Sequence, residues 1–356
     1  MERSLEEQAV PRVSVLMAVY NGEQYLAEAL DSVLAQTLSD IEIVVVDDAS
    51  TDGTAAILAD YAARDGRLVV LRNEENRKLA ASLNRGLAAC RAPLVARADA
   101  DDVNMPDRLE KQVAFLERHP EVGVLGSGFH RIGPGGEYLY SKGYAEDHET
   151  IRARQLFSGS LLHPSVVFRA DVVRGVGGYD ESYWTAQDTD LWARLHDRTR
   201  FANLPDTLVH YRTHGTSVVR TRGKAGLRLS LRVSQPLLED RLERTLTDEE
   251  VAAVVTLYRG HHALNPAGVR VGLPLLREVL QRVRQTEPPA AAQSLRREAA
   301  ASLLAQGGRH GLRDPRALRA LLCSAAALDP RLLASRRMAR LLPRAIGLHS
   351  AEPPAR

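Results

Sequence analysis

The N-terminal part of the chain alternates between strand and helix patterns, and this alternation restricts the fold more than any other feature. Apolar runs rich in β-branched residues, typical of strands buried on both faces, are separated by segments whose apolar residues have helical spacing. The strand patterns occupy residues 13–19, 41–46, 67–71 and 94–98, and the helical patterns residues 24–36, 54–64 and 79–90. This order is typical of right-handed βαβ units, so we predict an α/β fold with a mixed, mainly parallel sheet flanked by helices.

The remaining chain divides into a less regular stretch and a helical one. We expect helices over residues 106–118 and 187–196, and strands over residues 122–132, 138–140, 165–168 and 207–211. Beyond Arg220 strand patterns disappear. There Thr247 and Glu250 form a capping-box pattern, and the pairs Asp314-Pro315 and Asp329-Pro330 are typical helix starts.

Charge is distributed unevenly between these regions. Residues 1–220 contain 24 basic and 33 acidic side chains, whereas residues 221–356 contain 23 basic and 12 acidic ones. The acidic part suits a bound metal ion and the basic part an anionic surface. We therefore predict an N-terminal tail at residues 1–10, an α/β domain at 11–220 and an all-α region at 221–356.

Cysteine content and the N-terminal sequence indicate the cellular compartment. The two cysteines, Cys90 and Cys323, lie within apolar helical patterns, which predicts neither a disulfide framework nor a zinc site. The acidic N-terminus lacks the apolar core of a signal peptide, and no apolar run approaches the roughly 20 residues that span a bilayer. We predict a cytoplasmic protein.

Acidic residues cluster directly after the fourth strand pattern. Asp99, Asp101 and Asp102 would repel one another unless a cation such as Mg²⁺ or Mn²⁺ compensates them. In a parallel sheet the polar stretches at 19–23 and 47–52 would lie at the same edge. The alternative is a solvated acidic turn before a helix that begins at Pro106, with Asp102 serving that helix.

Seven segments resemble, in order, those of the nucleotide-sugar glycosyltransferases of family 2, which are inverting enzymes with the GT-A fold. They are VSVLMAVYNGEQYLAEALDSVLAQ, IEIVVVDDASTDGT, ARADADDVNMPDRLEKQ, HPSVVFR, GGYDE, AQDTDLWARL and YRTHGTS, which together lie within residues 11–217. The resemblance implies a GT-A (Rossmann-like) domain with a nucleotide-sugar-binding half at 11–105 and an acceptor and catalytic half at 106–220. The C-terminal region is outside the match.

Matching positions carry the family's donor-site roles. The resemblance implies that Ala18, Val19, Tyr20 and Glu23 line the nucleoside pocket, and that Asp48 accepts a hydrogen bond from the base. Alternatively, Asp48 caps the turn that follows it through backbone N–H groups.

One segment departs from the family pattern. Where relatives usually have glycine in an N-x-G-L segment, this chain has Asn76, Arg77, Lys78 and Leu79. Arg77 or Lys78 then either contacts the donor diphosphate, which a cation would favour, or lies on the surface at a helix start. We assign Lys78 to the donor site.

Asp99 and Asp101 match the family's metal-associated DxD pair. Asp101 is expected to bind Mn²⁺ or Mg²⁺, and Asp99 to contact the ribose or the donor sugar. A cation is required because negative charge grows on the diphosphate as the sugar leaves. His214 lies where some relatives have a histidine near the metal, so it either binds the ion or is unliganded.

Asp188 matches the family's general base, which takes the proton of the acceptor hydroxyl. Gln187 precedes it where the family more often has Glu. Asp188 is alternatively a helix N-terminal residue favoured by the helix dipole, and Asp190 is the expected structural carboxylate.

Three further residues concern the acceptor side. His163 is expected in the wall of the acceptor site, and Trp184 either offers a stacking face to a sugar or fills the core. Trp192 is predicted to lie in the core.

The resemblance predicts a metal-dependent inverting glycosyltransferase that uses a UDP- or dTDP-sugar and a glycan or lipid-linked acceptor in cell-surface polysaccharide biosynthesis. The alternative is a non-catalytic nucleotide-sugar or glycan-binding protein that retains the fold; the four carboxylates at 48, 99, 101 and 188 argue against it. A dinucleotide-dependent oxidoreductase is excluded because AVYNGE, and not GxGxxG, follows the first strand.

The basic C-terminal region has two interpretations. It either makes peripheral contact with an anionic membrane, which salt would weaken, or forms a lid or homodimer interface with solvated arginines. Nucleic acid is not an expected partner.

Overall fold

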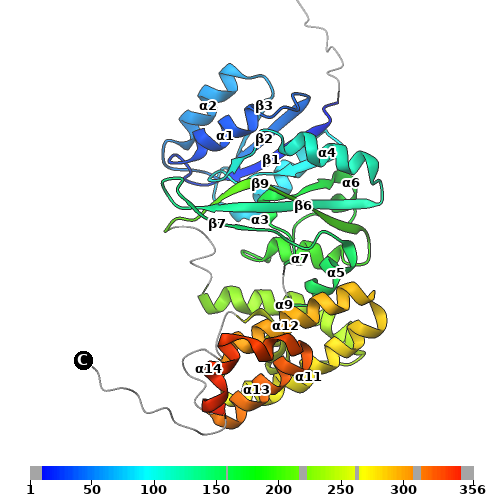
Figure 1. Cartoon of the computed structure of the whole chain (residues 1–356). Helices are drawn as coiled ribbons and strands as arrows, with labels where there is room; N and C mark the ends of the chain where they lie inside the picture. Colours follow the sequence, from blue (N-terminus) through cyan, green and yellow to red (C-terminus); the bar gives the residue numbers. More distant parts are fainter. Residues whose placement is uncertain (1–9, 158, 216–222, 261–263, 308–313, 346–356) are drawn as a thin grey trace, which may run out of the picture. The chain divides into compact units, whose positions relative to one another are not determined.

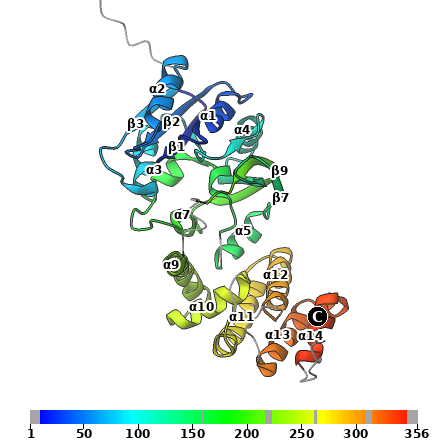
Figure 2. The ribbon, with the colours of Figure 1, turned by 90° about the vertical axis from the view of Figure 1, so that its left-hand side faces the viewer.

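The computed structural model describes residues 10–157, 159–215, 223–260, 264–307 and 314–345 (Figures 1 and 2). Two compact units divide the chain, one made of Met1–His148 and Gly159–Gly226, the other of Glu149–Ser158 and Leu227–Arg356.

The first unit is built on a nine-stranded sheet with the order β3-β2-β1-β4-β8-β6-β9-β5 among its described residues, and β7 pairs with β6. The strands are β1 (Val13–Val19), β2 (Ile41–Asp47), β3 (Leu68–Arg72), β4 (Leu94–Arg97), β5 (Val103–Asn104), β6 (Val122–Ile132), β7 (Tyr138–Lys142), β8 (Val167–Arg169) and β9 (Arg200–Arg212). Strands β1 to β4 pair in parallel, as predicted. Strands β6 and β9 also pair in parallel, over the longest register, whereas the other four pairs are antiparallel and short, so the predicted mixed, mainly parallel sheet is confirmed.

Helices flank this sheet (Figure 1). They are α1 (Leu26–Leu34), α2 (Thr54–Arg64), α3 (Lys78–Ala89), α4 (Arg108–Arg118), α6 (Ala170–Arg174) and α7 (Gln187–Arg194), with a 3-10 turn η1 (His163–Ser165). Leu26, Leu30 and Val33 of α1 are buried, the face that their spacing predicts. Because β2 is buried along its whole length, its continuous apolar run occupies the interior of the sheet, as expected.

The second unit is all-helical, as predicted for the C-terminal region. Its helices are α5 (His148–Gln155), α9 (Gly223–Leu242), α10 (Asp248–Arg259), α11 (Pro266–Thr286), α12 (Pro289–Gly307), α13 (Pro315–Leu328), η2 (Pro330–Ala334) and α14 (Arg336–Ala345). The capping box of Thr247 and Glu250 is present at α10, and Asp314 caps α13. Asp329 caps only the 3-10 turn η2. Within the described residues, no helix combines the length and apolarity needed to cross a membrane.

Residues 149–158 belong to the second unit, although the sequence analysis placed them in the α/β domain. The ring of Phe157 stacks on Tyr258 with centroids 4.0 Å apart, and Arg154 forms an ion pair with Glu298. Its helix, α5, has only eight residues, which is too short to assign to a domain from sequence alone.

Candidate active site

Three loops that follow parallel strands meet at one edge of the sheet. The backbone N–H of Asp48, after β2, donates to the carbonyl of Val19 in β1 at 2.8 Å. On the other side, a Cβ added at Gly22, after β1, would lie 3.9 Å from the Cβ of Ala100, after β4. The structure therefore brings together the polar stretches that the strand order predicts to converge.

Several backbone positions close to the predicted site residues are strained. Asn21, Ala49, Lys78 and Ala186 have positive φ angles of 51°, 61°, 70° and 62°, in the left-handed region that residues other than glycine seldom adopt. Each such position costs on the order of 1–3 kcal/mol and persists only where the surrounding structure imposes it. Asn21 and Ala49 lie in the loops after β1 and β2, Lys78 begins α3, and Ala186 precedes α7.

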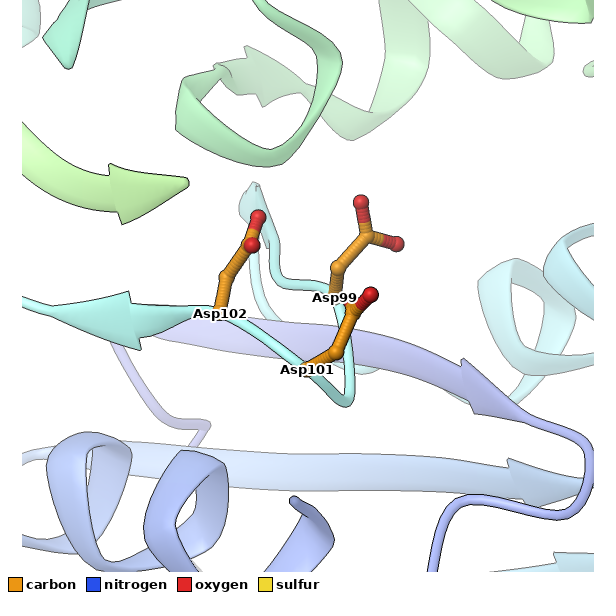
Figure 3. Close-up of side chains that lie close together, drawn as sticks. All are labelled: Asp99, Asp101 and Asp102. Carbon is orange, nitrogen blue, oxygen red and sulfur yellow. The ribbon is translucent and has the colours of Figure 1, made fainter. Parts of the chain in front are cut away.

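The carboxylates of Asp99, Asp101 and Asp102 gather after β4, and one oxygen from each lies within 4.8 Å of the others (Figure 3). Asp102 is only 1% exposed, so the alternative of a solvated acidic turn is wrong. Asp102 does not serve α4 either, because its Oδ1 accepts the backbone N–H of Arg212 in β9 at 2.8 Å.

The acid cluster is electrostatically unbalanced. Burial raises the pKa of Asp102 well above its usual range, and the carboxylates of Asp101 and Asp99 raise it further. Burial also raises the pKa of Asp101, with Asp99 adding to the shift and His214 opposing it. Within the described part of the chain, Oδ2 of Asp102 is buried without a hydrogen-bond partner. Clustered hard oxygen donors and an unsatisfied carboxylate oxygen fit Mn²⁺ or Mg²⁺, whose charge would offset the repulsion.

His214 lies at this cluster, with its Nε2 2.8 Å from Oδ2 of Asp101. Its ring centroid is 5.1 Å from that of Tyr25, and the guanidinium of Arg212 lies 4.6 Å from the Tyr25 ring centroid. Nη2 of Arg212 pairs with Oε2 of Glu28 at 2.6 Å. These contacts connect the end of β9 to the start of α1 beside the acid cluster.

Asp188 occupies the first turn of α7 and is half-buried. Burial raises the pKa of the Tyr179 phenol, the Arg97 guanidinium opposes that shift, and the carboxylates of Asp188 and Asp99 add to it. One phenol is therefore within electrostatic range of both Asp188 and a member of the acid cluster. Asp190, in contrast, is paired with Nη2 of Arg194 at 2.8 Å.

Arg97 and Tyr179 are site residues that the sequence analysis missed. Arg97 ends β4, is fully buried, and pairs through Nη2 with Asp99. The buried Tyr179 hydroxyl lies 2.8 Å from Nε2 of His163. Arg97 could have been recognised from the sequence, because it is a charged residue within an otherwise apolar strand pattern. Tyr179 lies in the GGYDE segment that resembles the family, but no role was assigned to it.

Asp48 is buried and engaged with the start of α3. Its Oδ1 accepts hydrogen bonds from Nδ2 of Asn73 at 2.6 Å and from the backbone N–H of Arg77 at 2.8 Å, and Oδ2 accepts the N–H of Lys78 at 2.9 Å. The turn that directly follows β2 is instead held by Asp47, which accepts the N–H of Ser50. The alternative that Asp48 caps that turn is therefore wrong.

The other predicted donor-site residues differ in exposure. Val19 is buried, Ala18 is half-buried, and the Tyr20 side chain is 50% exposed. The carboxylate of Glu23 accepts the N–H of Gly53 at 2.6 Å. This bond joins the loops after β1 and β2.

The predicted acceptor-side residues separate into buried and exposed ones. Trp192 is 1% exposed, which confirms that it belongs to the core. His163 is buried against it, with ring centroids 6.2 Å apart. Trp184 is 45% exposed, so it does not fill the core.

Comparisons with known proteins agree with this architecture. The family model described as Glycosyl transferase family 2 matches residues 14–177. EpsE of Bacillus subtilis (strain 168), provisionally named a glycosyltransferase, is 38% identical over 209 residues, which cover 57% of this chain and 73% of EpsE. The O-antigen biosynthesis glycosyltransferase WbnJ of Escherichia coli is 30% identical over 240 residues, which cover 66% of this chain and 91% of WbnJ.

The chain belongs to glycosyltransferase family 2. Its fold is similar to that of S. aureus TarS residues 1–349, solved in complex with UDP-GlcNAc, with a TM-score of 0.56, 18% identity and 90% of both chains covered. The predicted GT-A fold is thereby confirmed.

Proposed function

We propose that this member of family 2 is a metal-dependent inverting transferase that moves a sugar from a nucleoside-diphosphate sugar to a hydroxyl of a glycan or lipid-linked acceptor. The observation that carries the proposal is the acid cluster, in which one carboxylate oxygen each of Asp99, Asp101 and Asp102 lies within 4.8 Å of the others, with His214 Nε2 2.8 Å from Asp101. Such a cluster at the carboxyl ends of parallel strands suits a metal ion that holds a diphosphate leaving group.

The donor side is assigned to the loops after β1, β2 and β4. Asp101 and Asp102, with His214, would hold Mn²⁺ or Mg²⁺, and Asp99 would contact the donor sugar. When bound, the cation offsets the charge that develops on the diphosphate leaving group. The exposed Tyr20 would stack on the nucleoside base. Oδ2 of Asp48, which accepts a hydrogen bond from one protein N–H group, would accept another from an N–H group of that nucleoside base.

Asp188 would act on the acceptor. As the acceptor oxygen attacks the anomeric carbon, its proton passes to the Asp188 carboxylate. The bond between that carbon and the diphosphate oxygen breaks, the nucleoside diphosphate leaves with the bonding electrons, and the configuration inverts. The proton on Asp188 is then lost to solvent.

The family resemblance favours a UDP- or dTDP-sugar as donor. The relative WbnJ carries the name of an O-antigen biosynthesis enzyme. We assign the present chain by analogy to cell-surface polysaccharide synthesis in the cytoplasm.

The second unit offers a basic cavity that suits a peripheral membrane contact. A cavity of about 530 Å³ lies between α11 and α13, and its lining includes Arg270, Arg277 and Arg316. Apolar residues such as Leu273 share this lining. Guanidinium groups beside an apolar wall suit the phosphate and the first carbons of an anionic lipid, at the inner face of the plasma membrane. A homodimer interface through the same helices is the competing assignment.

A screen of nucleotide sugars tests the proposed reaction. Donor hydrolysis and thermal stabilisation are measured with and without Mn²⁺ for the wild type, Asp101→Ala and Asp188→Asn. We expect Asp101→Ala to lose Mn²⁺-dependent stabilisation by the donor, and Asp188→Asn to retain it while transfer falls by at least a hundredfold.

Two outcomes would contradict the proposal. Normal transfer by Asp188→Asn would show that another group is the base. Stabilisation by a nucleotide sugar without turnover of any donor would instead indicate a non-catalytic binding protein.

A further inference from the structure

Four aromatic side chains meet where β6, β7 and β9 lie side by side, and we call Phe129, Tyr140, Tyr144 and Tyr211 the aromatic wall. The centroid of the buried Phe129 ring lies 6.3 Å from that of Tyr140, 6.2 Å from that of Tyr144 and 5.6 Å from that of Tyr211. Tyr140 is 46% exposed, and Tyr144 and Tyr211 are half-buried. The wall thus consists of one buried phenyl ring, that of Phe129, and three partly accessible phenol rings.

The strand register places the wall on one face of the sheet. Tyr140 of β7 lies opposite Arg131 of β6, which in turn lies opposite Tyr211 of β9. Side chains of directly opposed residues share a face. The Arg131 guanidinium lies 5.0 Å from the Tyr211 ring centroid, so a cation–π contact orients that ring.

The wall lies beside both parts of the proposed reaction centre. Burial raises the pKa of the Tyr144 phenol, and the Asp188 carboxylate raises it further. Burial also raises the pKa of the Tyr211 phenol, with Asp102 and Asp99 adding to the shift. The residue after Tyr211, Arg212, donates its backbone N–H to Oδ1 of Asp102 at 2.8 Å, so the wall adjoins the acid cluster. The Asp188 contribution to the pKa of Tyr144 agrees with the proposed base lying at the other end of the wall.

We infer that the aromatic wall is the acceptor-binding subsite, where a pyranose ring of a glycan acceptor stacks on Tyr140 and Tyr144 so that one of its hydroxyls reaches Asp188. A pyranose has an apolar C–H face and a polar rim. Stacking buries the apolar face against the rings, while the phenol O–H groups hydrogen-bond to sugar hydroxyls. The inference rests on the proposed role of Asp188 as the base, and it assigns acceptor contacts to Tyr140 and Tyr144, which lie outside the segments that resemble the family.

The hairpin supplies its own matched control. Tyr138 is on the same strand as Tyr140 and is 63% exposed, but its ring packs against His130 and not against the wall. Tyr138→Ala therefore removes an equally accessible aromatic ring from the same hairpin. Tyr144→Phe keeps the stacking ring and removes only the hydroxyl, which separates loss of stacking from loss of a hydrogen bond.

The experiment measures acceptor binding apart from catalysis. Methyl β-glycosides of glucose, galactose and N-acetylglucosamine are used as probes in saturation-transfer NMR, with UDP and Mn²⁺ present. Octyl glycosides of the same sugars serve as acceptors for nucleoside diphosphate release. We expect Tyr140→Ala and Tyr144→Ala to raise the acceptor KM about tenfold and to lose saturation transfer, as the loss of one aromatic stack implies. Tyr138→Ala should match the wild type both in acceptor KM and in donor hydrolysis without acceptor, and Tyr144→Phe should stay within about threefold of the wild-type acceptor KM.

Several results would overturn the inference. They are the absence of saturation transfer to any probe in the wild type, an unchanged response in Tyr140→Ala and Tyr144→Ala, and a changed donor KM in place of the acceptor KM. Asp188→Asn distinguishes failure of the acceptor-site inference from failure of the proposed function. If Asp188→Asn still transfers sugar, the assignment of Asp188 as the base is wrong, whereas the saturation-transfer experiment still tests whether the aromatic wall binds the acceptor.

Discussion

Lys78 combines backbone strain with an exposed cationic side chain, which allows its two contributions to be separated by mutation. Its φ angle is 70°, and its backbone N–H is held by Asp48. A left-handed conformation costs an L-residue about 1–2 kcal/mol, a cost that glycine does not incur. Glycine loses about 0.4–1 kcal/mol through the greater entropy of the unfolded chain. We therefore expect Lys78→Gly to raise the free energy of unfolding by about 0.5–1 kcal/mol, or the Tm by about 1–4 °C.

The same substitution should weaken donor binding. A charge-assisted contact from a lysine ammonium to a diphosphate contributes about 1.5–3 kcal/mol, so its loss should raise the donor KM roughly tenfold to a hundredfold. Thermal melts without ligand and donor kinetics with Mn²⁺ measure the two effects separately. Lys78→Ala should show the same kinetic loss without the gain in Tm, because alanine retains the strained backbone.

Arg77 provides the control. It is an exposed neighbouring cation with a φ angle of −92°, so Arg77→Gly should lower the Tm where Lys78→Gly raises it. A lower Tm for Lys78→Gly would refute the strain argument. An unchanged donor KM in Lys78→Gly would refute the contact between Lys78 and the diphosphate. A raised donor KM in Arg77→Ala would show that Arg77 makes this contact instead.

Four further predictions follow from the contacts and pKa shifts. Burial raises the folded-state pKa of Asp102, so the unfolded carboxyl releases its proton first as the pH rises. Metal-free wild type should therefore lose stability as the pH rises above about 4, and Asp102→Asn should lack this loss in melts with EDTA; parallel curves would contradict it. Phe157→Ala should lower the free energy of unfolding by about 3–5 kcal/mol, because a buried ring stacked on Tyr258 is lost. If a denaturant titration finds that this free energy falls by less than about 1 kcal/mol, Phe157 does not belong to the core of the helical unit. Burial raises the pKa of the Cys90 thiol to about 12, so iodoacetamide at pH 8 should label the exposed Cys323 and leave Cys90 unmodified. Peptide mass spectrometry measures the labelling of each cysteine, and equal labelling would disprove the burial of Cys90. Sedimentation with phosphatidylglycerol vesicles should be reduced by high salt and by the triple substitution Arg270→Gln, Arg277→Gln and Arg316→Gln, whereas salt-insensitive sedimentation would exclude a peripheral electrostatic contact.

The parallel strands were predictable because burial on both faces requires a continuous apolar run. Ile41–Asp47 has such a run and lies inside the sheet. The last strand was predicted only at residues 207–211, whereas β9 spans Arg200–Arg212. Polar residues and Pro205 interrupt its pattern, and register shifts along β6 and β9 accommodate them. Bulged strands with mixed burial lack the period on which the prediction depends.

Site residues were predictable where several acidic residues follow a strand, and unpredictable where a site is assembled across strands. Asp99, Asp101 and Asp102 are adjacent in sequence, so their proximity required no tertiary information. Tyr140 and Tyr211 come together only through the register of β7, β6 and β9. A lone tyrosine in a hairpin gives no sequence signal of a binding role, because the same pattern suits any half-exposed strand.

Asp48 explains the backbone conformation of the segment that departs from the family pattern. Its carboxylate holds the N–H groups of Arg77 and Lys78, which fixes the chain entering α3 in a conformation that suits glycine. Relatives with glycine there would have no strain, and this chain places a lysine in the same conformation. Because Asp48 imposes this conformation, every residue other than glycine retains the strain at this position, and only a gain elsewhere offsets it. Asp48→Asn should therefore disturb the backbone at Lys78 as well as the proposed contact between Asp48 and the nucleoside base. Comparing the donor kinetics of Asp48→Asn with those of Lys78→Gly would distinguish the effect of the disturbed backbone from the loss of that contact.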